Sequence, residues 1–321
     1  MNSDIILVIL GEPNSTFSEV LFKYFSSINF KKNKNRIILI GNSKLLLKQM
    51  KKLNYDFNVN EILNVKDYLK KSINILNVDY SFSKPFTKIS GSSNKYIESC
   101  FNLAIKFIKL NKINKLINGP ISKTHFLKKK FPGITEYIGF KTNKKEQVML
   151  IYNHNLSVCP LTTHVPIKNV AKFVKKIKII NTVTKIKQFY KSRLGIIPKI
   201  ALLGLNPHCE TTALISEEKK EIIPAIKYLI KKKINVSGPF SADTFFLSKN
   251  IKKFDVVIGM YHDQVLTPIK TLFRFNAINV TIGLPFIKVT PDHGPNYEMV
   301  GKNKSDPSSI FYAFNFLDKI K

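Results

Sequence analysis

Four of the six histidines in this chain follow short apolar segments, a placement that suits metal or substrate chemistry. They are His164 after residues 158–161, His208 after residues 201–205, His262 after residues 256–260, and His293 after residues 287–290. If these segments are parallel strands, the carboxyl ends of neighbouring strands meet at one edge of a sheet, where such proteins bind ligands. Three imidazoles there would give a divalent metal ion neutral nitrogen ligands and leave positions open for substrate. Their spacing is too wide for a local metal motif, so hydrogen-bonded loop histidines are the alternative.

Apolar segments alternate with amphipathic ones along the chain, which predicts an α/β protein with parallel strands joined by helices. The expected strands are residues 5–10, 36–41, 116–118, 148–152, 157–161, 199–205, 256–260 and 277–283. The expected helices are residues 18–27, 43–53, 94–110, 167–190, 217–231 and 307–317, with a new helix beginning near Asn181 inside the fourth. The basic segment from Asp67 to Lys95 is expected to be an irregular surface region.

The composition excludes several classes of protein. With 321 residues, 44% apolar and 23% charged, the chain has room for two ordinary domains or one large one, and disordered, collagen-like and disulfide-rich classes are excluded. No apolar run reaches the length of a membrane span, and the run from Ile5 to Leu10 is too short for a signal peptide. The three distant cysteines indicate reduced thiols. We therefore expect a cytoplasmic protein without a membrane partner.

The net charge of +31 raises a nucleic-acid-binding protein as an alternative. However, only three of the 52 basic residues are arginines, whereas recognition of phosphates and bases favours the guanidinium group. Lysine also crowds most exposed segments together with Asn and Ile, as expected for a genome that drifts toward A and T. A nucleic-acid partner is therefore expected to be absent, and the alternative is kept for a direct test.

Segments along nearly the whole chain resemble, in the same order, 4-hydroxythreonine-4-phosphate dehydrogenases of the PdxA family. The most specific are Gly-Leu-Asn-Pro-His at 204–208, Gly-Pro-Phe-Ser-Ala-Asp-Thr at 238–244, Met-Tyr-His-Asp-Gln at 260–264, Asn-Val-Thr-Ile-Gly-Leu-Pro-Phe-Ile at 279–287 and Asp-Pro-Ser-Ser at 306–309. Gly-Glu-Pro at 11–13, Gly-Pro-Ile-Ser-Lys at 119–123, Phe-Pro-Gly-Ile-Thr-Glu at 131–136 and Thr-Thr-His-Val-Pro at 162–166 agree with them.

The resemblance implies a fold like that of isocitrate and isopropylmalate dehydrogenases. Each subunit would have two α/β/α layers with the active site in the cleft between them, and a homodimer would share its active sites across the interface. We expect one α/β domain over residues 1–130, with the C-terminal helix of residues 300–321 packing back on it. The second α/β domain, over residues 131–299, would hold most of the metal and substrate motifs.

The implied activity is oxidation and decarboxylation of 4-phosphooxy-L-threonine to 3-amino-2-oxopropyl phosphate in pyridoxal 5'-phosphate biosynthesis, with NAD or NADP and a divalent metal ion. The family's metal ligands fall on His164, His208 and His262, and zinc, cobalt, magnesium or manganese would suit the site. Neither the metal nor the choice between NAD and NADP follows from the sequence, and no residue is assigned to bind the nicotinamide cofactor.

The remaining site residues also come from the resemblance. The positions that contact the phosphorylated substrate are occupied here by Ile134, Thr135, Lys270, Asn279 and Lys288. Asp243 and Asp263 are candidates for proton transfer or for orienting the histidines, with helix capping as the alternative.

Three features depart from the family pattern. Ile134 stands where the family has a histidine, and Lys288 stands where it has an arginine. The loop after Pro13 and the segment after His208 both lack the family's glycines. These departures leave open the same chemistry on another phosphorylated hydroxy acid of the phosphothreonate or phosphoerythronate type, and also an inactive structural relative.

Overall fold

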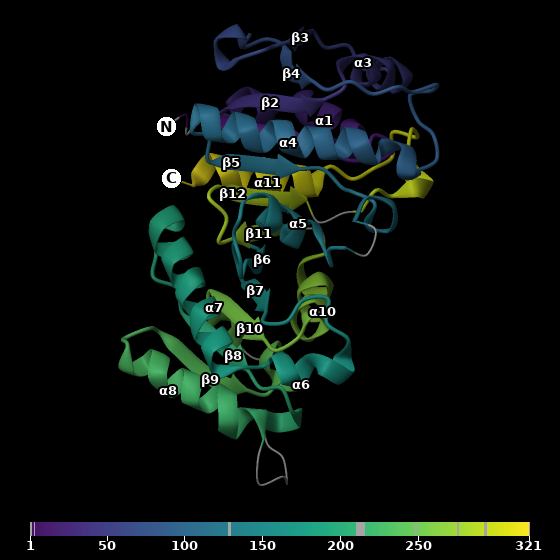
Figure 1. Ribbon diagram of the computed structural model, residues 1–321. Coiled ribbons are helices and arrows are strands. Elements are labelled where there is room, and N and C mark those ends of the chain that lie inside the picture. The colour runs from purple at the N-terminus through teal and green to yellow at the C-terminus, as the bar shows by residue number, and fades with distance from the viewer. Residues whose placement is uncertain are drawn as a thin grey trace. The chain divides into compact units, whose positions relative to one another are not determined.

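The computed structural model describes residues 2, 4–127, 130–209, 216–247, 249–274, 276–291 and 294–320 (Figure 1). The chain divides into two compact units. Unit 1 contains the chain up to Lys144 and the segment Leu284–Ile320, and unit 2 contains Lys145–Gly283. Strands and helices alternate in both units, so the predicted α/β class is confirmed.

Unit 1 is built on six parallel strands. In spatial order they are β3 (Val59–Glu61), β4 (Ile73–Asn77), β2 (Arg36–Gly41), β1 (Ile5–Ile9), β5 (Lys115–Asn118) and β12 (Ile287–Pro291). Every residue of β1 is buried, as expected for a parallel strand covered on both faces. In β12, Lys288 pairs with Leu116 of β5.

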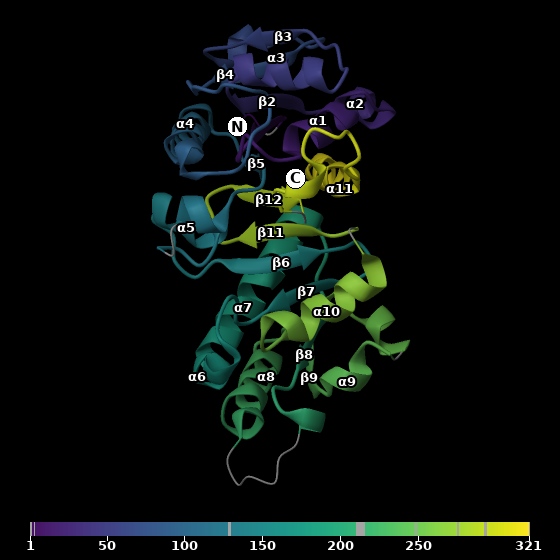
Figure 2. The ribbon, with the colours of Figure 1, turned by 90° about the vertical axis from the view of Figure 1, so that its right-hand side faces the viewer.

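Helices cover both faces of the sheet in unit 1. They are α1 (Phe17–Phe25), α2 (Ile28–Lys32), α3 (Ser43–Lys52), α4 (Asn94–Asn111), α5 (Ile134–Lys141) and α11 (Ser308–Lys319). Figure 2 shows α4 and α5 on one face, and α1, α2 and α11 on the other. Helix α4 turns a buried stripe of Ile97, Phe101, Ala104 and Ile108 to the core, at the spacing of an amphipathic helix.

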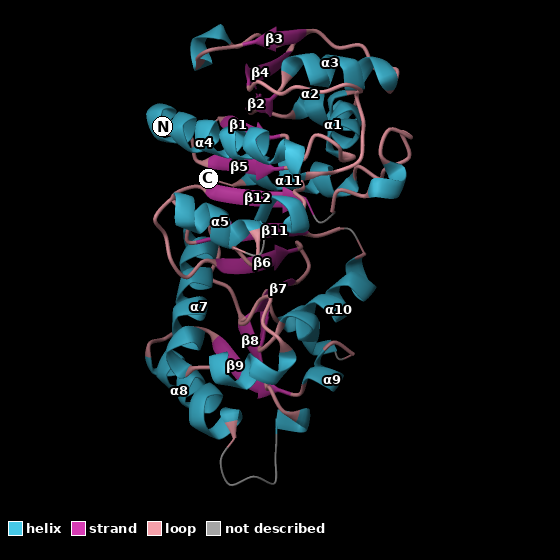
Figure 3. Cartoon of the chain, turned by 45° about the vertical axis from the view of Figure 1, so that its right-hand side comes forward, coloured by secondary structure: helices cyan, strands magenta, loops and turns pink. Residues whose placement is uncertain are grey.

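Unit 2 is built on six strands that form a mixed sheet (Figure 3). In spatial order they are β11 (Ile278–Ile282), β6 (Val148–Tyr152), β7 (Ser157–Pro160), β10 (Val256–Gly259), β8 (Ile200–Leu203) and β9 (Val236–Phe240). Strand β6 is antiparallel to both β11 and β7, whereas β7, β10, β8 and β9 are parallel to one another. The four parallel strands therefore end at one edge.

The helices of unit 2 also lie on two faces. Figure 2 shows α6 (Val170–Phe173), α7 (Lys176–Phe189) and α8 (Ile223–Lys231) on one face, with α9 (Ala242–Phe245) and α10 (His262–Phe273) on the other. None of the helices in the described ranges is both long enough and apolar enough to cross a lipid bilayer. All three cysteines, each within the described ranges, are free thiols, as the sequence predicted.

The predicted strands and most of the predicted helices are present, and the differences have local causes. The helix expected over residues 167–190 breaks at Val174 and Lys175 rather than near Asn181. Strand β4 lies inside the segment expected to be irregular. Its buried Asn74 accepts from the Leu69 backbone N–H and donates to the Leu69 and Ser72 carbonyls. The amide is thus satisfied inside the sheet.

Candidate functional site

The three candidate metal ligands follow three neighbouring parallel strands of unit 2. His164 follows β7, His262 follows β10 and His208 follows β8, and these strands lie side by side in the order β7, β10, β8. The chain visits them in a different order, so their adjacency comes from the sheet topology. The carboxyl ends of parallel strands are where open α/β sheets bind ligands. His293 lies outside the described residues.

Two side-chain hydrogen bonds join the ends of these strands. The Thr162 hydroxyl donates to the Met260 carbonyl at 2.7 Å, which links the segments after β7 and β10. Gln264 accepts from the Met260 backbone N–H at 2.6 Å and donates to the Gly204 carbonyl at 2.7 Å, which links β10 to the segment after β8. Thr162 and Gln264 fix the spacing of the segments that hold the histidines. Both residues lie within the motifs at 162–166 and 260–264, but no role was predicted for either of them.

Glu218 holds the backbone that leads to His208. One carboxylate oxygen accepts from the backbone N–H groups of Leu205 and Asn206, both at 2.8 Å, and the other accepts from the Asn206 amide at 2.7 Å. Burial alone would raise the pKa of Glu218, but these hydrogen bonds outweigh it and hold the pKa below its usual value. Glu218 was not predicted as a site residue, and its signal in the sequence is an acidic side chain at the start of the helix expected over residues 217–231.

The candidate ligands differ in their surroundings. The His164 and His262 rings lie 6.1 Å apart between centroids. His262 Nδ1 lies 2.7 Å from Asp263 Oδ1, so Nε2 is the nitrogen left to bind a metal ion. His208 Nδ1 lies 3.6 Å from Asp243 Oδ2. Within the described ranges, no three His, Cys, Asp or Glu side chains lie close enough to hold a metal ion, so the three-histidine site stays a prediction.

Two of the candidate ligands adopt the left-handed backbone region, as do other residues spread over the described chain. His164 and His208 have φ values of 51° and 55°, and Cys209 has a φ of 60°. Residues with a side chain rarely adopt this left-handed region, and strain of this kind clusters at functional sites. The imidazoles have the right donor chemistry for a divalent metal ion, and carboxylates lie beside His208 and His262.

The two candidate acid–base residues are exposed carboxylates. The Ser241 hydroxyl donates to Asp243, and this hydrogen bond, with a smaller contribution from His208, holds the pKa of Asp243 below its usual value. Asp243 is therefore ionised at neutral pH, which suits proton acceptance or the orientation of His208 rather than proton donation. Asp263 is bound to its neighbour His262. The roles of both carboxylates stay predictions.

The candidate substrate residues lie in both units. Lys270 on α10 and Asn279 on β11 belong to unit 2 with the histidines, and Asn279 Oδ1 is buried without a hydrogen-bond partner in the described part of the chain. Thr135 on α5 and Lys288 on β12 belong to unit 1. Lys288 is 0% exposed, and burial lowers its pKa to about 7.

Ile134 has a structural explanation. It is the first residue of α5 and packs against the hydrophobic core of unit 1. An apolar side chain fits that contact, whereas it cannot hydrogen bond to a substrate. The isoleucine that stands in place of the family's substrate-binding histidine therefore contributes to packing in this chain.

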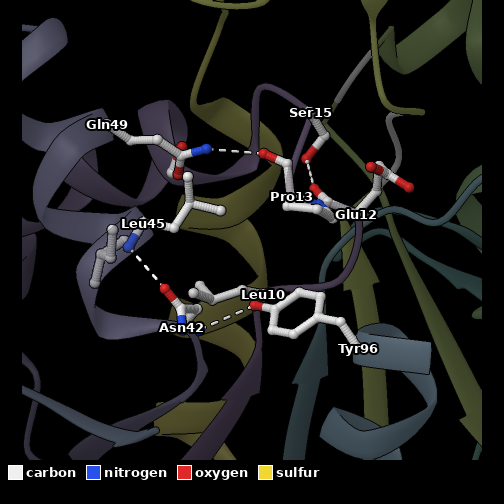
Figure 4. Close-up of a pocket in the computed structure, with 10 residues that line it drawn as sticks. Leu10, Glu12, Pro13, Ser15, Asn42, Leu45, Gln49 and Tyr96 are labelled. Atoms are coloured by element: carbon white, nitrogen blue, oxygen red, sulfur yellow. Dashed lines mark hydrogen bonds between the residues drawn. The ribbon is translucent and has the colours of Figure 1, made fainter. Parts of the chain in front are cut away.

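A small pocket lies beside the N-terminal loop of unit 1 (Figure 4). Its wall includes Glu12, whose two carboxylate oxygens accept from the Asn14 backbone N–H and the Ser93 hydroxyl. Burial raises the pKa of Glu12. Gln49 donates to the Pro13 carbonyl at 2.8 Å. These hydrogen bonds hold the loop that lacks the family's glycines, and none of the candidate site residues lines the pocket.

One loop glycine remains where the backbone requires it. Gly11 has a φ of 72°, and a Cβ atom there would lie 2.5 Å from the Pro120 carbonyl oxygen. The loop thus keeps its close contact with the segment after β5 even though later glycines are replaced. The other segment without glycines, residues 210–215, lies outside the described residues.

In comparisons with known proteins, the chain is similar to proteins of the PdxA family. The sequence profile of the family described as "Pyridoxal phosphate biosynthetic protein PdxA" matches residues 33–317. The chain is 37% identical over 315 residues to a 4-hydroxythreonine-4-phosphate dehydrogenase from Sulfurihydrogenibium sp., covering 96% of this chain and 95% of the relative. It is 29% identical to a protein from Oceanobacillus iheyensis that is provisionally named a D-threonate 4-phosphate dehydrogenase, covering 97% and 96%.

Solved structures agree on the fold. The crystal structure of a 4-hydroxythreonine-4-phosphate dehydrogenase from Burkholderia phymatum superposes with a TM-score of 0.81 at 26% identity, covering 99% of this chain and 98% of that one. Isocitrate dehydrogenase from Methylococcus capsulatus superposes with a TM-score of 0.51 at 8% identity, covering 98% and 84%. The expected likeness to the isocitrate dehydrogenase fold is therefore confirmed.

Proposed function

The chain belongs to the PdxA family, and we propose from that membership that it oxidises and decarboxylates 4-phosphooxy-L-threonine to 3-amino-2-oxopropyl phosphate. NAD or NADP would accept the hydride, and a divalent metal ion would assist. The observation that supports the proposal most is the grouping of His164, His208 and His262 after three adjacent parallel strands, which Thr162 and Gln264 tie together. The product would serve pyridoxal phosphate biosynthesis.

The reaction has two stages. The substrate carbon that bears the hydroxyl group loses a hydride to the nicotinamide and the hydroxyl loses its proton, which leaves a β-keto acid. The carboxylate then leaves as carbon dioxide, and protonation of the resulting enol gives the amino ketone phosphate. A divalent metal ion held by the three histidines would lower the hydroxyl pKa and stabilise negative charge on that oxygen in both stages.

Residues of this chain would accept the proton, orient a metal ligand and bind the substrate. Asp243, ionised at neutral pH, would accept the hydroxyl proton, and Asp263 would orient His262 through its Nδ1 atom. Asn279 Oδ1, buried and without a partner in the described residues, would accept a hydrogen bond from the substrate. Thr135, Lys270 and Lys288 would contact its phosphate or carboxylate. A homodimer that shares its active sites is part of the proposal.

The test is to incubate the purified protein with 4-phosphooxy-L-threonine and either NAD or NADP. The proposal predicts equal amounts of reduced cofactor and carbon dioxide. Reduced cofactor without carbon dioxide would refute the decarboxylation, and neither product would refute the substrate assignment. Light scattering of the same sample tests the dimer.

A second candidate function is the same chemistry on D-threonate 4-phosphate. The similarity to the Oceanobacillus iheyensis protein favours it, as do Ile134 and Lys288 at positions that depart from the family pattern. This substrate has a hydroxyl group where 4-phosphooxy-threonine has an ammonium group. A higher kcat/KM for D-threonate 4-phosphate than for 4-phosphooxy-L-threonine would establish the second function and replace the first.

A further inference from the structure

Lys23 on α1 binds the backbone of a segment that lies far away in the sequence. Its Nζ atom donates to the Ser305 carbonyl at 2.7 Å and to the Asn303 carbonyl at 3.2 Å. The same ammonium group pairs with Glu19 Oε1 at 2.9 Å, one turn earlier on the helix. Glu19 Oε1 also accepts from the Ser305 backbone N–H at 2.6 Å. The two side chains therefore hold both backbone polar groups of Ser305.

The Glu19–Lys23 pair is more buried than an ordinary surface ion pair. The Glu19 side chain is 1% exposed, whereas the Asp4 carboxylate that pairs with Arg36 is 53% exposed. A buried ion pair is often no more stabilising than apolar side chains in its place. Glu19 Oε2 and the Ser305 hydroxyl oxygen are also buried without hydrogen-bond partners in the described part of the chain, which costs further stability. Stability alone therefore does not account for this arrangement, whereas fixing the Ser305 backbone does.

Ser305 belongs to the connection between β12 and α11, whose described part is residues 294–307. Within that part the connection has one short turn, Tyr297–Met299. Long connections with so little regular structure are usually binding loops or flexible linkers. This one follows the carboxyl end of β12, which is parallel to β5, and the carboxyl ends of parallel strands are where α/β sheets bind ligands. Its place in unit 1 therefore favours a binding loop.

The connection is anchored at both of its described ends and exposed between them. The Thr16 backbone N–H, in the loop after β1, donates to the Pro295 carbonyl at 3.3 Å. The ion pair on α1 holds the other end at Ser305. Lys302 and Lys304 are exposed between these anchors, and ammonium groups form strong hydrogen bonds with phosphate oxygens. The connection thus has a fixed course and a basic surface, which suits a phosphate-bearing ligand.

We propose that Glu19 and Lys23 are positioning residues that hold the β12–α11 connection in the shape that binds a phosphate-bearing reactant. The inference rests on the proposed function, because that reactant is either the phosphorylated substrate or the nicotinamide cofactor. The hold on Ser305, by contrast, is a property of the folded chain itself. Glu19 and Lys23 touch neither reactant and act through the connection. Their loss should therefore weaken binding without removing a group that takes part in the chemistry.

The first experiment needs no reactant. Amide hydrogen exchange over residues 294–307, followed by mass spectrometry, compares the wild type with Lys23→Met and Arg36→Met. Lys23→Met keeps the apolar stem but leaves Glu19 buried without its cation, so these amides should exchange at least about tenfold faster. Arg36→Met is the matched control, because it breaks an ion pair at the amino end of β2, on the opposite edge of the same sheet. It should leave exchange in this segment unchanged. Unchanged exchange in Lys23→Met would overturn the inference.

The second experiment titrates NAD, NADP, 4-phosphooxy-L-threonine and D-threonate 4-phosphate separately against the same proteins, and then measures kcat and KM. Lys23→Met should raise the Kd and KM of at least one of these reactants about tenfold, with a smaller change in kcat, because the connection is displaced. The reactant affected tells the cofactor from the substrate. Lys23→Arg keeps the charge and several N–H donors, so it should lose less affinity than Lys23→Met.

Two results would refute the positioning role. Faster exchange in Lys23→Met with every Kd unchanged would show that the ion pair is structural only. An equal loss of affinity in Arg36→Met would show that the effect is not specific to the connection. If the wild type binds a reactant but turns over neither candidate substrate, the proposed function fails, while the titrations still decide the inference. If the wild type binds none of the four compounds, both fail.

Discussion

Gln264, in the first turn of α10, donates a hydrogen bond to the Gly204 carbonyl at 2.7 Å while its own carbonyl oxygen accepts from the Met260 backbone N–H at 2.6 Å. One amide side chain thus joins β10 to the segment that follows β8. Both of these segments lead to candidate metal ligands, His262 and His208. The amide needs its donor and its acceptor at once, which is why glutamine rather than glutamate suits this position.

Replacing the amide of Gln264 with a carboxylate tests this link. Gln264→Glu should keep the acceptor for Met260 but set a carboxylate oxygen against the Gly204 carbonyl. We expect the free energy of unfolding to fall by about 1 to 3 kcal/mol and turnover to fall at least tenfold, because the spacing of the two strand ends is lost. Urea unfolding and steady-state kinetics measure the two effects. Wild-type turnover in a destabilised variant would show that the link is structural only.

Glu218 should make stability depend on pH in the acid range. Its pKa is lower in the folded chain than in the unfolded chain, so its contribution is present above the usual carboxyl pKa of about 4.3. That contribution is lost as the pH falls through the folded pKa. Glu218→Gln should be less stable than the wild type by about 1 to 3 kcal/mol at neutral pH, with the difference shrinking toward low pH. Parallel stability curves for the two proteins would contradict this account.

Lys288 should make stability depend on pH in the opposite way, at neutral to alkaline pH. Its pKa is about 7 in the folded chain and about 10.4 in the unfolded chain, so stability should rise with pH between these values. Each pKa unit corresponds to about 1.4 kcal/mol, which gives a rise of about 4 to 5 kcal/mol at most. Lys288→Met should remove this dependence and be more stable than the wild type below pH 7. Chemical unfolding across the range provides the measurement, and a variant that is less stable at every pH would refute the assignment.

The charge of +31 should not make the chain a nucleic-acid-binding protein. Because nearly all of the basic residues are lysines, we expect weak contacts with phosphates that salt screens. A filter-binding titration with duplex DNA and with RNA should retain no complex at physiological salt. Retention that falls steeply as salt increases would revive the nucleic-acid alternative.

Much of the fold follows from local sequence, because fully buried parallel strands are short runs of branched apolar residues. The chain's β1 and β10 are of this kind and were predicted. Helix α10 was not predicted, since Pro268 lies inside it and proline normally ends a helix. The break before α7 was placed wrongly because the apolar spacing continues across residues 174–175 and gives no signal there.

The site was only partly predictable. Polar residues after apolar runs indicated strand ends, but the order β7, β10, β8 depends on the topology of the whole sheet. The burial of Lys288 could not be predicted from its residue type, because lysine is usually a solvated surface residue and the chain has many lysines. Gln264 bonds to the backbone of Gly204 in another segment, and Glu218 bonds to the backbone of Leu205 and Asn206, and backbone groups carry no residue-specific signal.

The most direct test of the central claim is turnover of 4-phosphooxy-L-threonine with and without a metal chelator, in the wild type, His208→Ala and His154→Ala. His154 is an exposed histidine in the turn after β6 and has no proposed role, so it serves as the matched control. The account predicts that reduced cofactor forms with the wild type and with His154→Ala, and that it is lost with chelator and in His208→Ala. Turnover that survives both chelation and the loss of His208 would contradict the three-histidine metal site.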